Sequence, residues 1–123
     1  MAGFEQLQVW QRSMALVPRV YRLARQLPGD ENYVLKPQMK RASISVPSNI
    51  AEGHARRGKR EFARFISHAQ GSLAELLTQL QLTIDLGYIK QRRLTAVIEE
   101  IRQLSRMLNA TRRKLLHPLI SNL

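Results

Sequence analysis

Ser43-Ile-Ser-Val-Pro-Ser-Asn-Ile-Ala-Glu-Gly53 is the stretch of sequence on which the fold prediction depends. It continues a run of apolar residues spaced three and four apart, a pattern typical of one face of an α-helix: Leu35, Met39, Ala42, Val46 and Ile50. Pro47 disturbs this helix, because proline removes one intrahelical hydrogen bond and clashes with the preceding turn. The pattern therefore predicts a helix over about residues 35–53 that kinks at Pro47. The alternative is a restart at Asn49, whose spacing to Glu52 resembles a capping box.

The polar residues that follow Pro47 fit a structural role. A proline leaves a backbone carbonyl of its own helix without a partner, so Asn49 and Glu52 are expected to satisfy hydrogen-bonding groups around the kink. Gly53 has no Cβ and would allow another part of the chain to approach closely before the next loop. Gly71 and Ser72 are likewise expected at a close helix–helix contact. The alternative for Asn49 and Glu52 is a polar site near a subunit junction.

Outward from this stretch, three breaks divide the chain into four helical segments. The breaks fall at Pro28-Gly29-Asp30, at His54-Ala55-Arg56-Arg57-Gly58 and at Leu86-Gly87-Tyr88. Every long segment between them has apolar residues at helical spacing, and none alternates as a strand does. The predicted helices cover about residues 6–27, 35–53, 59–86 and 91–116, with Gly87 as a left-handed cap and Pro118 ending the fourth helix. Short loops between such helices predict an all-α fold, an up-down-up-down antiparallel four-helix bundle forming a single domain over residues 1–123.

The composition excludes several classes of protein. The chain has 123 residues and no cysteine, which excludes a disulfide scaffold, thiol catalysis and a cysteine-ligated metal site. No apolar run approaches the roughly 18–20 residues that span a bilayer, and the first residues do not resemble the core of a signal peptide. A cytoplasmic protein without a membrane partner is therefore expected.

No motif in the chain indicates an enzyme. The serines lack the Gly-x-Ser-x-Gly pattern of a nucleophile elbow, and neither a P-loop nor a dinucleotide fingerprint is present. The three histidines do not take part in the Glu-x-x-His motifs of di-iron bundles: His54, His68 and His117. We therefore expect no catalytic residue, no metal and no cofactor.

The charge of the chain is strongly positive. Twenty Lys and Arg against nine Asp and Glu give a formal net charge of +11, which predicts attraction to polyanions. In the predicted bundle, the loop before the third helix lies at the same end as the C-terminus of the fourth. Seven basic residues then gather at this end: Arg56, Arg57, Lys59, Arg60, Arg112, Arg113 and Lys114. We expect them to bind nucleic-acid phosphates with little sequence specificity. The alternative is that they form a solvated face, with those in a last helical turn favouring the helix dipole.

The first predicted helix is apolar over an unusually wide arc. One stripe is expected to face the core: Leu7, Trp10, Met14, Val17, Tyr21 and Ala24. A second stripe adjoins it: Val9, Leu16, Val20, Leu23 and Leu27. Together they cover roughly 200°, about twice what one amphipathic face needs. We expect the second stripe to be an oligomer interface that meets another protomer along Pro37, Ile44 and Ala51. The alternative is that the helix lies deep within its own bundle.

Several motifs together carry a resemblance to a known family. Besides Ser43–Gly53, they are Leu7-Gln-Val-Trp-Gln11, Glu61-Phe-Ala-Arg-Phe65, Gln70-Gly-Ser-Leu-Ala-Glu-Leu76 and Asp85-Leu-Gly-Tyr-Ile89. The chain resembles, from about Phe4 to Leu108, the bacterial four-helix-bundle family of proteins encoded in intervening sequences of large-subunit ribosomal RNA genes. The accessory variability protein of diversity-generating retroelements is a relative. The resemblance implies a four-helix protomer, a ring-shaped homopentamer and no enzymatic activity. For the retroelement relatives it also implies nucleic-acid binding and docking to a reverse transcriptase.

The sequence therefore leaves two alternative functions. The first is a non-enzymatic oligomer that binds RNA or DNA through the seven basic residues, with several weak phosphate sites combined on one scaffold. The second is a protein-interaction scaffold that docks a nucleic-acid-handling partner such as a reverse transcriptase. The expected partners are further copies of the chain and nucleic acid, and in the second case a protein.

Overall fold

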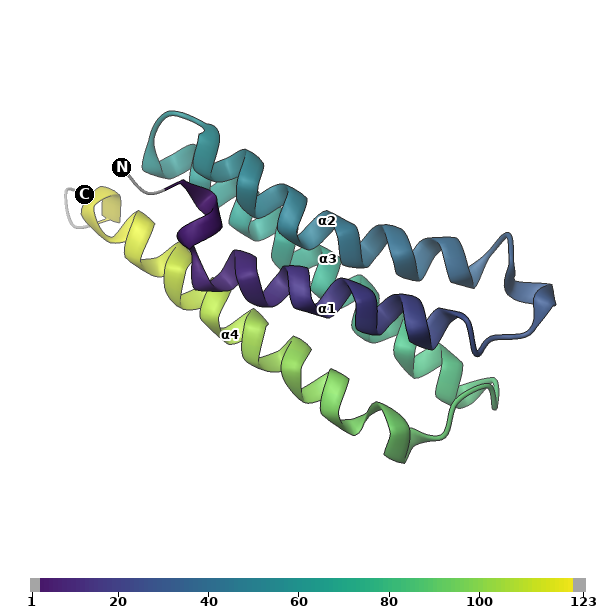
Figure 1. Cartoon of the computed structure of the whole chain (residues 1–123). Coiled ribbons are helices and arrows are strands. Elements are labelled where there is room, and N and C mark those ends of the chain that lie inside the picture. The colour runs from purple at the N-terminus through teal and green to yellow at the C-terminus, as the bar shows by residue number, and fades with distance from the viewer. Residues whose placement is uncertain (1–2, 121–123) are drawn as a thin grey trace.

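Four helices run alongside one another and alternate in direction along the chain (Figure 1). The computed structural model describes residues 3–120, and side chains as far as His117. The elements are a 3₁₀ turn η1 (Phe4–Gln6), α1 (Gln8–Ala24), a 3₁₀ turn η2 (Gly29–Glu31), α2 (Leu35–Ala55), α3 (Lys59–Asp85) and α4 (Gln91–Ile120). The part of the chain described contains no strand. The predicted all-α four-helix bundle is confirmed for these residues.

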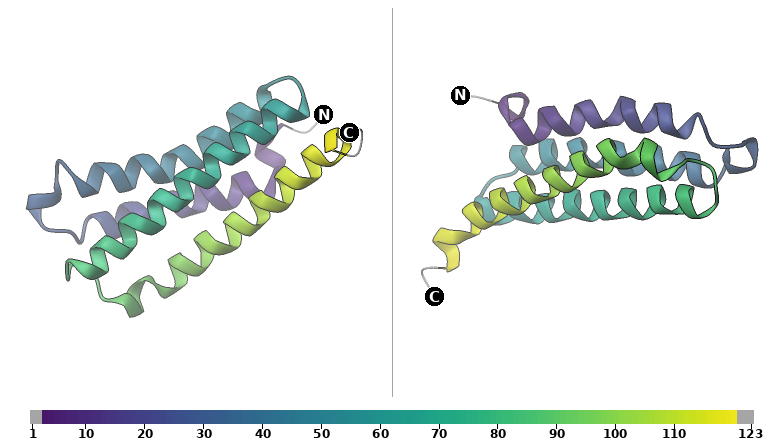
Figure 2. Two further views of the ribbon diagram at one scale, coloured as in Figure 1. Left: turned by 180° about the vertical axis from the view of Figure 1, so that it is seen from behind. Right: turned by 90° about the horizontal axis from the view of Figure 1, so that it is seen from below.

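The helices pack in cyclic order, because α1 contacts α2, α2 contacts α3, α3 contacts α4, and α4 returns to α1. The start of the chain, the connection from α2 to α3 and the end of α4 lie at one end of the bundle (Figure 2). The α1–α2 and α3–α4 connections lie at the other end. The α1/α2 face therefore lies opposite the α3/α4 face.

Both internal prolines lie within continuous helices. Pro18 is inside α1 and Pro47 is inside α2, so the restart at Asn49 is wrong. The apolar face explains the continuity of α2, because its predicted residues are all buried: Leu35, Met39, Ala42, Val46 and Ile50. The free energy gained by burying this stripe exceeds the cost of one missing hydrogen bond. At the other end of the chain, α4 continues to Ile120 and does not end near residue 116 as predicted.

Two glycines shape the loops. Gly87 has a φ of 79°, and its N–H donates to the carbonyl of Ile84 at 3.0 Å, which confirms the left-handed cap of α3. Gly58 has a φ of 94° and lies immediately before α3. A side chain at either position would strain the backbone, because L-residues rarely adopt these angles. The sharp turn at Gly58 places the basic residues on its two sides at the same end of the bundle.

The structure corrects the predicted orientation of α1. The expected oligomer interface instead belongs to the core of the protomer: Val9, Leu16, Val20 and Leu27 are at most 7% exposed, and Leu23 is partly buried against that core. Of the stripe expected to face inward, Ala24 is buried, whereas Met14 is 45% exposed. Ser13 explains the orientation of α1, because this small residue is buried on the same face as Leu16 and Val20 and lets α1 approach its neighbours.

None of the described helices is long and apolar enough to cross a membrane. The buried residues instead form one continuous cluster to which all four helices contribute. Leu73, Leu76 and Leu80 from α3 and Ile101 and Leu104 from α4 are each 1% exposed or less. The helices are therefore amphipathic, and their apolar faces are used within the bundle.

Candidate nucleic-acid interface

The seven predicted basic residues lie at the end of the bundle that carries the α2–α3 connection and the last turns of α4 (Figure 1). We call this set the basic end: Arg56, Arg57, Lys59, Arg60, Arg112, Arg113 and Lys114. Six of the seven are exposed, and Arg112 is partly buried. The fold therefore places these residues at one end of the bundle, as the alternating helix directions predict.

The first turn of α3 is the most informative part of the basic end. Lys59 and Arg60 are the first two residues of α3, where the helix dipole presents partial positive charge. Cations here are disfavoured by the dipole, since an N-terminal turn favours acidic residues. A stabilising dipole interaction explains neither Lys59 and Arg60 nor Arg113 and Lys114, because the latter two lie before the last turn of α4.

Arg56 is held against an aromatic side chain. Its Nη2 donates to Oε1 of Glu52 at 2.8 Å, and its guanidinium lies 5.2 Å from the ring centre of Phe65. The guanidinium of Arg64 lies 4.8 Å from the same ring, and the imidazole of His68 stacks on it at 5.6 Å. Phe65 is thus in contact with two cations, which fixes Arg56 beside the loop.

Arg64 was not predicted from the sequence to belong to this cluster around Phe65. Its guanidinium makes two hydrogen bonds to the carboxylate of Glu61, at 2.7 and 3.1 Å. These hydrogen bonds lower the pKa of Glu61 and raise the pKa of Arg64. The three-residue spacing of Glu61 and Arg64 on α3 indicates the ion pair, but only the fold shows that Arg64 also covers Phe65.

Arg112 is the least available member of the basic end. Its Nη2 donates to Oδ1 of Asn109 at 2.9 Å, and its Nε is buried without a partner. In contrast, five members make no ion pair with any described residue: Arg57, Lys59, Arg60, Arg113 and Lys114. These five exposed cations are the residues best placed to contact phosphates in solution.

The contacts of Asn49 and Gly53 support a structural role for the motif around Pro47. Nδ2 of Asn49 donates to the carbonyl of Ser45 at 2.8 Å and to its Oγ at 2.9 Å. A Cβ on Gly53 would lie 2.5 Å from Cβ of Phe65, so α2 and α3 are in close contact there as predicted. The expectation for Glu52 was wrong, because its carboxylate pairs with Arg56 one turn later and not with a group beside Pro47.

A second feature is an apolar groove between α1 and α2. It has a volume of about 460 Å³ and is lined by Trp10, Met14, Val17, Pro18, Ile44, Pro47, Ser48 and Ala51. Ile44 is 42% exposed, and Met14 is similarly exposed. The stripe of α1 that was expected to face the core, which includes Trp10, Met14 and Val17, therefore lies beside Ile44 and Ala51 of α2 on the same protomer. We call it the outer stripe of α1.

The described residues contain no group of three or more His, Asp or Glu side chains that could hold a metal ion. Two of the three histidines pack against aromatic side chains. His54 packs edge-on against Phe62, with ring centres 5.6 Å apart, and His68 stacks on Phe65. His117 is exposed near the end of α4.

Comparisons with known proteins identify the fold and the family. The model of the 23S rRNA-intervening sequence protein family matches residues 5–110. The range includes the α2–α3 connection and excludes the last three members of the basic end. A similar solved structure is the crystal structure of a protein with unknown function from the S23 ribosomal protein family of Bacteroides thetaiotaomicron VPI-5482. It is 20% identical with a TM-score of 0.76, and the alignment covers 83% of this chain and 95% of that chain. No curated protein matches the chain.

Proposed function

We propose that this chain, which belongs to the 23S rRNA-intervening sequence protein family, is a non-enzymatic bundle that assembles with copies of itself and binds RNA or DNA through its basic end. The observation that carries the proposal is the gathering of five exposed cations without an ion pair at one end of the bundle: Arg57, Lys59, Arg60, Arg113 and Lys114. These cations have no acidic partner among the described residues, so a polyanion is a ligand that would satisfy all five together.

Binding of this kind neutralises phosphates and releases counterions. The basic end combines exposed cations with the Arg56 guanidinium, which Phe65 and Glu52 hold beside the loop. Such an arrangement contacts the backbone and does not read base sequence, because it inserts no helix or strand into a groove. The expected affinity is therefore strongly salt-dependent and weakly sequence-specific.

Self-assembly would place several basic ends on one scaffold. The exposed apolar groove on the α1/α2 face is one half of the proposed contact between protomers. The other half is a hollow of mixed character on the opposite α3/α4 face, where Leu77, Leu82 and Ile98 lie beside polar and charged residues that include Asp85 and Arg102. Contact between two different faces is heterologous, and repeated heterologous contacts close into a ring when the rotation between copies allows it.

The proposed ring is a homopentamer, the assembly that the family resemblance implies. Several weak phosphate-binding ends held together gain avidity without any new contact. The groove at Met14 and Ile44 also favours a second candidate function, a scaffold that docks a nucleic-acid-handling protein, because such a groove fits an apolar protein surface better than a polyanion.

A pair of charge reversals tests the nucleic-acid function. Lys59→Glu with Arg60→Glu should strongly weaken the binding of labelled single-stranded RNA in a fluorescence anisotropy assay. The matched control is Arg92→Glu with Arg93→Glu, two exposed cations in the first turn of α4 at the other end of the bundle. The control should bind RNA much as the wild type does. If both pairs reduce binding equally, the basic end is not a site, and the scaffold function becomes the better explanation.

A further inference from the structure

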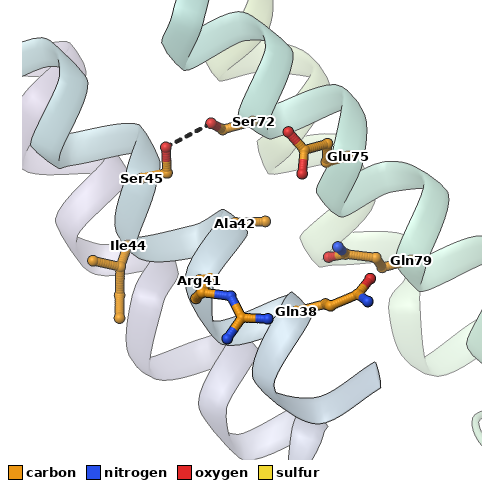
Figure 3. Close-up of a pocket in the computed structure, with 8 residues that line it drawn as sticks. All are labelled: Gln38, Arg41, Ala42, Ile44, Ser45, Ser72, Glu75 and Gln79. Carbon is orange, nitrogen blue, oxygen red and sulfur yellow. Dashed lines mark hydrogen bonds between the residues drawn. The ribbon is translucent and has the colours of Figure 1, made fainter. Parts of the chain in front are cut away.

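A polar cavity lies between α2 and α3, separate from the basic end and from the α1/α2 groove. Its volume is about 620 Å³, within the range of small-molecule sites. It is lined by Gln38, Arg41, Ala42, Ile44 and Ser45 from α2 and by Ser72, Glu75 and Gln79 from α3. Figure 3 shows that Glu75 and Gln79 extend from α3 toward α2, while Arg41 and Gln38 extend from the facing helix.

The hydroxyl groups of the cavity are already paired. Oγ of Ser45 and Oγ of Ser72 share a hydrogen bond of 2.8 Å, and Ser72 also donates to the carbonyl of His68. Asn49 donates to Ser45 from the next turn of α2. The hydroxyl groups of Ser45 and Ser72 therefore already have hydrogen-bond partners. The remaining polar side chains of the cavity are the ones that can bind an incoming molecule.

Gln79 is the group whose hydrogen bonding is incomplete. Its side chain is only 7% exposed, and its Oε1 has no hydrogen-bond partner. A buried amide oxygen without a partner is destabilising, since it loses its water without gaining a donor. An N–H donor that enters the cavity, with a small rotation of the amide, would supply the missing bond.

Arg41 and Glu75 line the same cavity without pairing. No salt bridge joins them or links either to another described residue, although they carry opposite charges on facing helices. The α2 side thus offers the donors of a guanidinium, and the α3 side offers a carboxylate and an amide oxygen. A molecule that bridges them needs acceptors on one edge and N–H donors on the adjacent edge.

We propose that this cavity binds a guanine base. Guanine carries the acceptors O6 and N7 on one edge, which match the fork of Arg41. Its adjacent edge carries N1–H and the N2 amino group, two neighbouring donors that match the two oxygens of Glu75, with Oε1 of Gln79 as a further acceptor. Adenine, cytosine and uracil each lack two neighbouring N–H donor groups on one edge, so they satisfy the carboxylate less completely. The site does not depend on the proposed function of the basic end.

Titration calorimetry of the full chain with guanosine, adenosine and cytidine 5′-monophosphates tests this assignment. Guanosine monophosphate should bind at least tenfold more tightly than the other two. Glu75→Gln should weaken guanosine monophosphate at least tenfold, and Gln79→Leu should weaken it while the protein stays at least as stable. The control is Glu99→Gln, an exposed glutamate of α4 that does not line the cavity. Equal affinities for the three nucleotides, or unchanged binding in Glu75→Gln, would overturn the assignment.

The base could come from a free nucleotide or from a nucleic-acid strand, and competition separates the two sources. A single-stranded oligonucleotide with one guanine that displaces guanosine monophosphate supports a base within a strand. Failure of the oligonucleotide to compete supports the free nucleotide. Binding in the cavity is recognised by its dependence on Glu75. The Lys59→Glu, Arg60→Glu variant can therefore lose RNA binding at the basic end and still bind guanosine monophosphate in the cavity.

Discussion

Gly53 of α2 lies directly against Phe65 of α3, so close that a Cβ on the glycine would stand 2.5 Å from Cβ of Phe65. The same Cβ would stand 3.1 Å from Cδ1 of Phe62. This contact brings α2 and α3 together immediately before their connecting loop. It also holds Phe65 in place beneath Arg56, and so it positions the core of the basic end.

Substitution of Gly53 should therefore destabilise the protein. Gly53→Ala forces α2 and α3 apart, and we expect a loss of about 1–3 kcal/mol in the free energy of unfolding. The matched control is Gly71→Ala, because an added Cβ there meets nothing within 4 Å, so the helix–helix contact expected at Gly71 was wrong. The control should be stabilising by about 0.4–1 kcal/mol, because alanine is the better helix former. Urea denaturation of both variants gives the two values, and equal effects would contradict the close contact.

The corrected orientation of α1 gives a second prediction. Leu16 is 1% exposed, so Leu16→Ala should cost about 2–5 kcal/mol of stability through the cavity it leaves. Arg22→Ala, at an exposed position on the same helix, should change stability by no more than about 0.5 kcal/mol. Thermal unfolding followed by circular dichroism measures both. A mild effect at Leu16 would show that this stripe faces outward after all.

The oligomer interface is tested on the outer stripe of α1. Met14→Glu with Ile44→Glu places two charges in the α1/α2 groove, and we expect the variant to be a folded monomer because buried unpaired charge is costly. The wild-type chain should elute as an oligomer under the same conditions. Size-exclusion chromatography with light scattering distinguishes them. A monomeric wild type, or a variant that stays assembled, would show that the α1/α2 groove is not an oligomer interface.

The ion pair between α1 and α4 predicts a dependence of stability on pH. Nε and Nη2 of Arg12 donate to the two carboxylate oxygens of Glu100 at 3.0 and 2.9 Å, and these bonds lower the pKa of Glu100. The stabilisation is present above the ordinary glutamate pKa of about 4.5 and is lost as the pH falls through the lowered folded-state value. Glu100→Gln should cost about 0.5–1 kcal/mol at pH 7.

The same variant shows whether the pair is responsible. The difference in stability between wild type and Glu100→Gln should shrink toward zero as the pH falls below the lowered folded-state pKa of Glu100, because both side chains are then neutral. Urea titrations at neutral pH and at a series of acidic pH values measure this difference. A difference that does not change with pH would assign the effect of the substitution to packing near Met107, whose Sδ lies 3.0 Å from Nη1 of Arg12.

Most of the fold could be predicted from periodicity, but the orientation of α1 could not. The stripes of α2 and α3 are each unique, so Met39, Val46 and Leu73 could be assigned to the core. In α1 both stripes are apolar, and hydrophobicity alone does not decide which faces inward. The deciding signal was Ser13, a small residue that is buried on the same face as Leu16 and Val20.

The candidate site was predictable where it depends on helix direction and not where it depends on side-chain contacts. Helices that alternate in direction place Arg57 and Arg113 at the same end of the bundle. This prediction requires only the number of helices. The contact of Arg64 with Phe65 requires the rotation of α3 about its own axis. The incomplete hydrogen bonding of Gln79 requires the packing of α3 against α2, because a glutamine at a helical position is ordinarily solvated.

The central claim is that the basic end neutralises several phosphates together, and the salt dependence of RNA binding tests it most directly. Anisotropy of labelled single-stranded RNA, titrated with protein from low salt to about 150 mM, gives the slope of the logarithm of affinity against the logarithm of salt concentration. We predict a steep negative slope with binding that survives near 150 mM, and a slope shallower by about 1.4 in Lys59→Glu with Arg60→Glu, about 0.7 for each lost phosphate contact. Binding that disappears well below 150 mM, or a slope unchanged by the two reversals, would contradict the account.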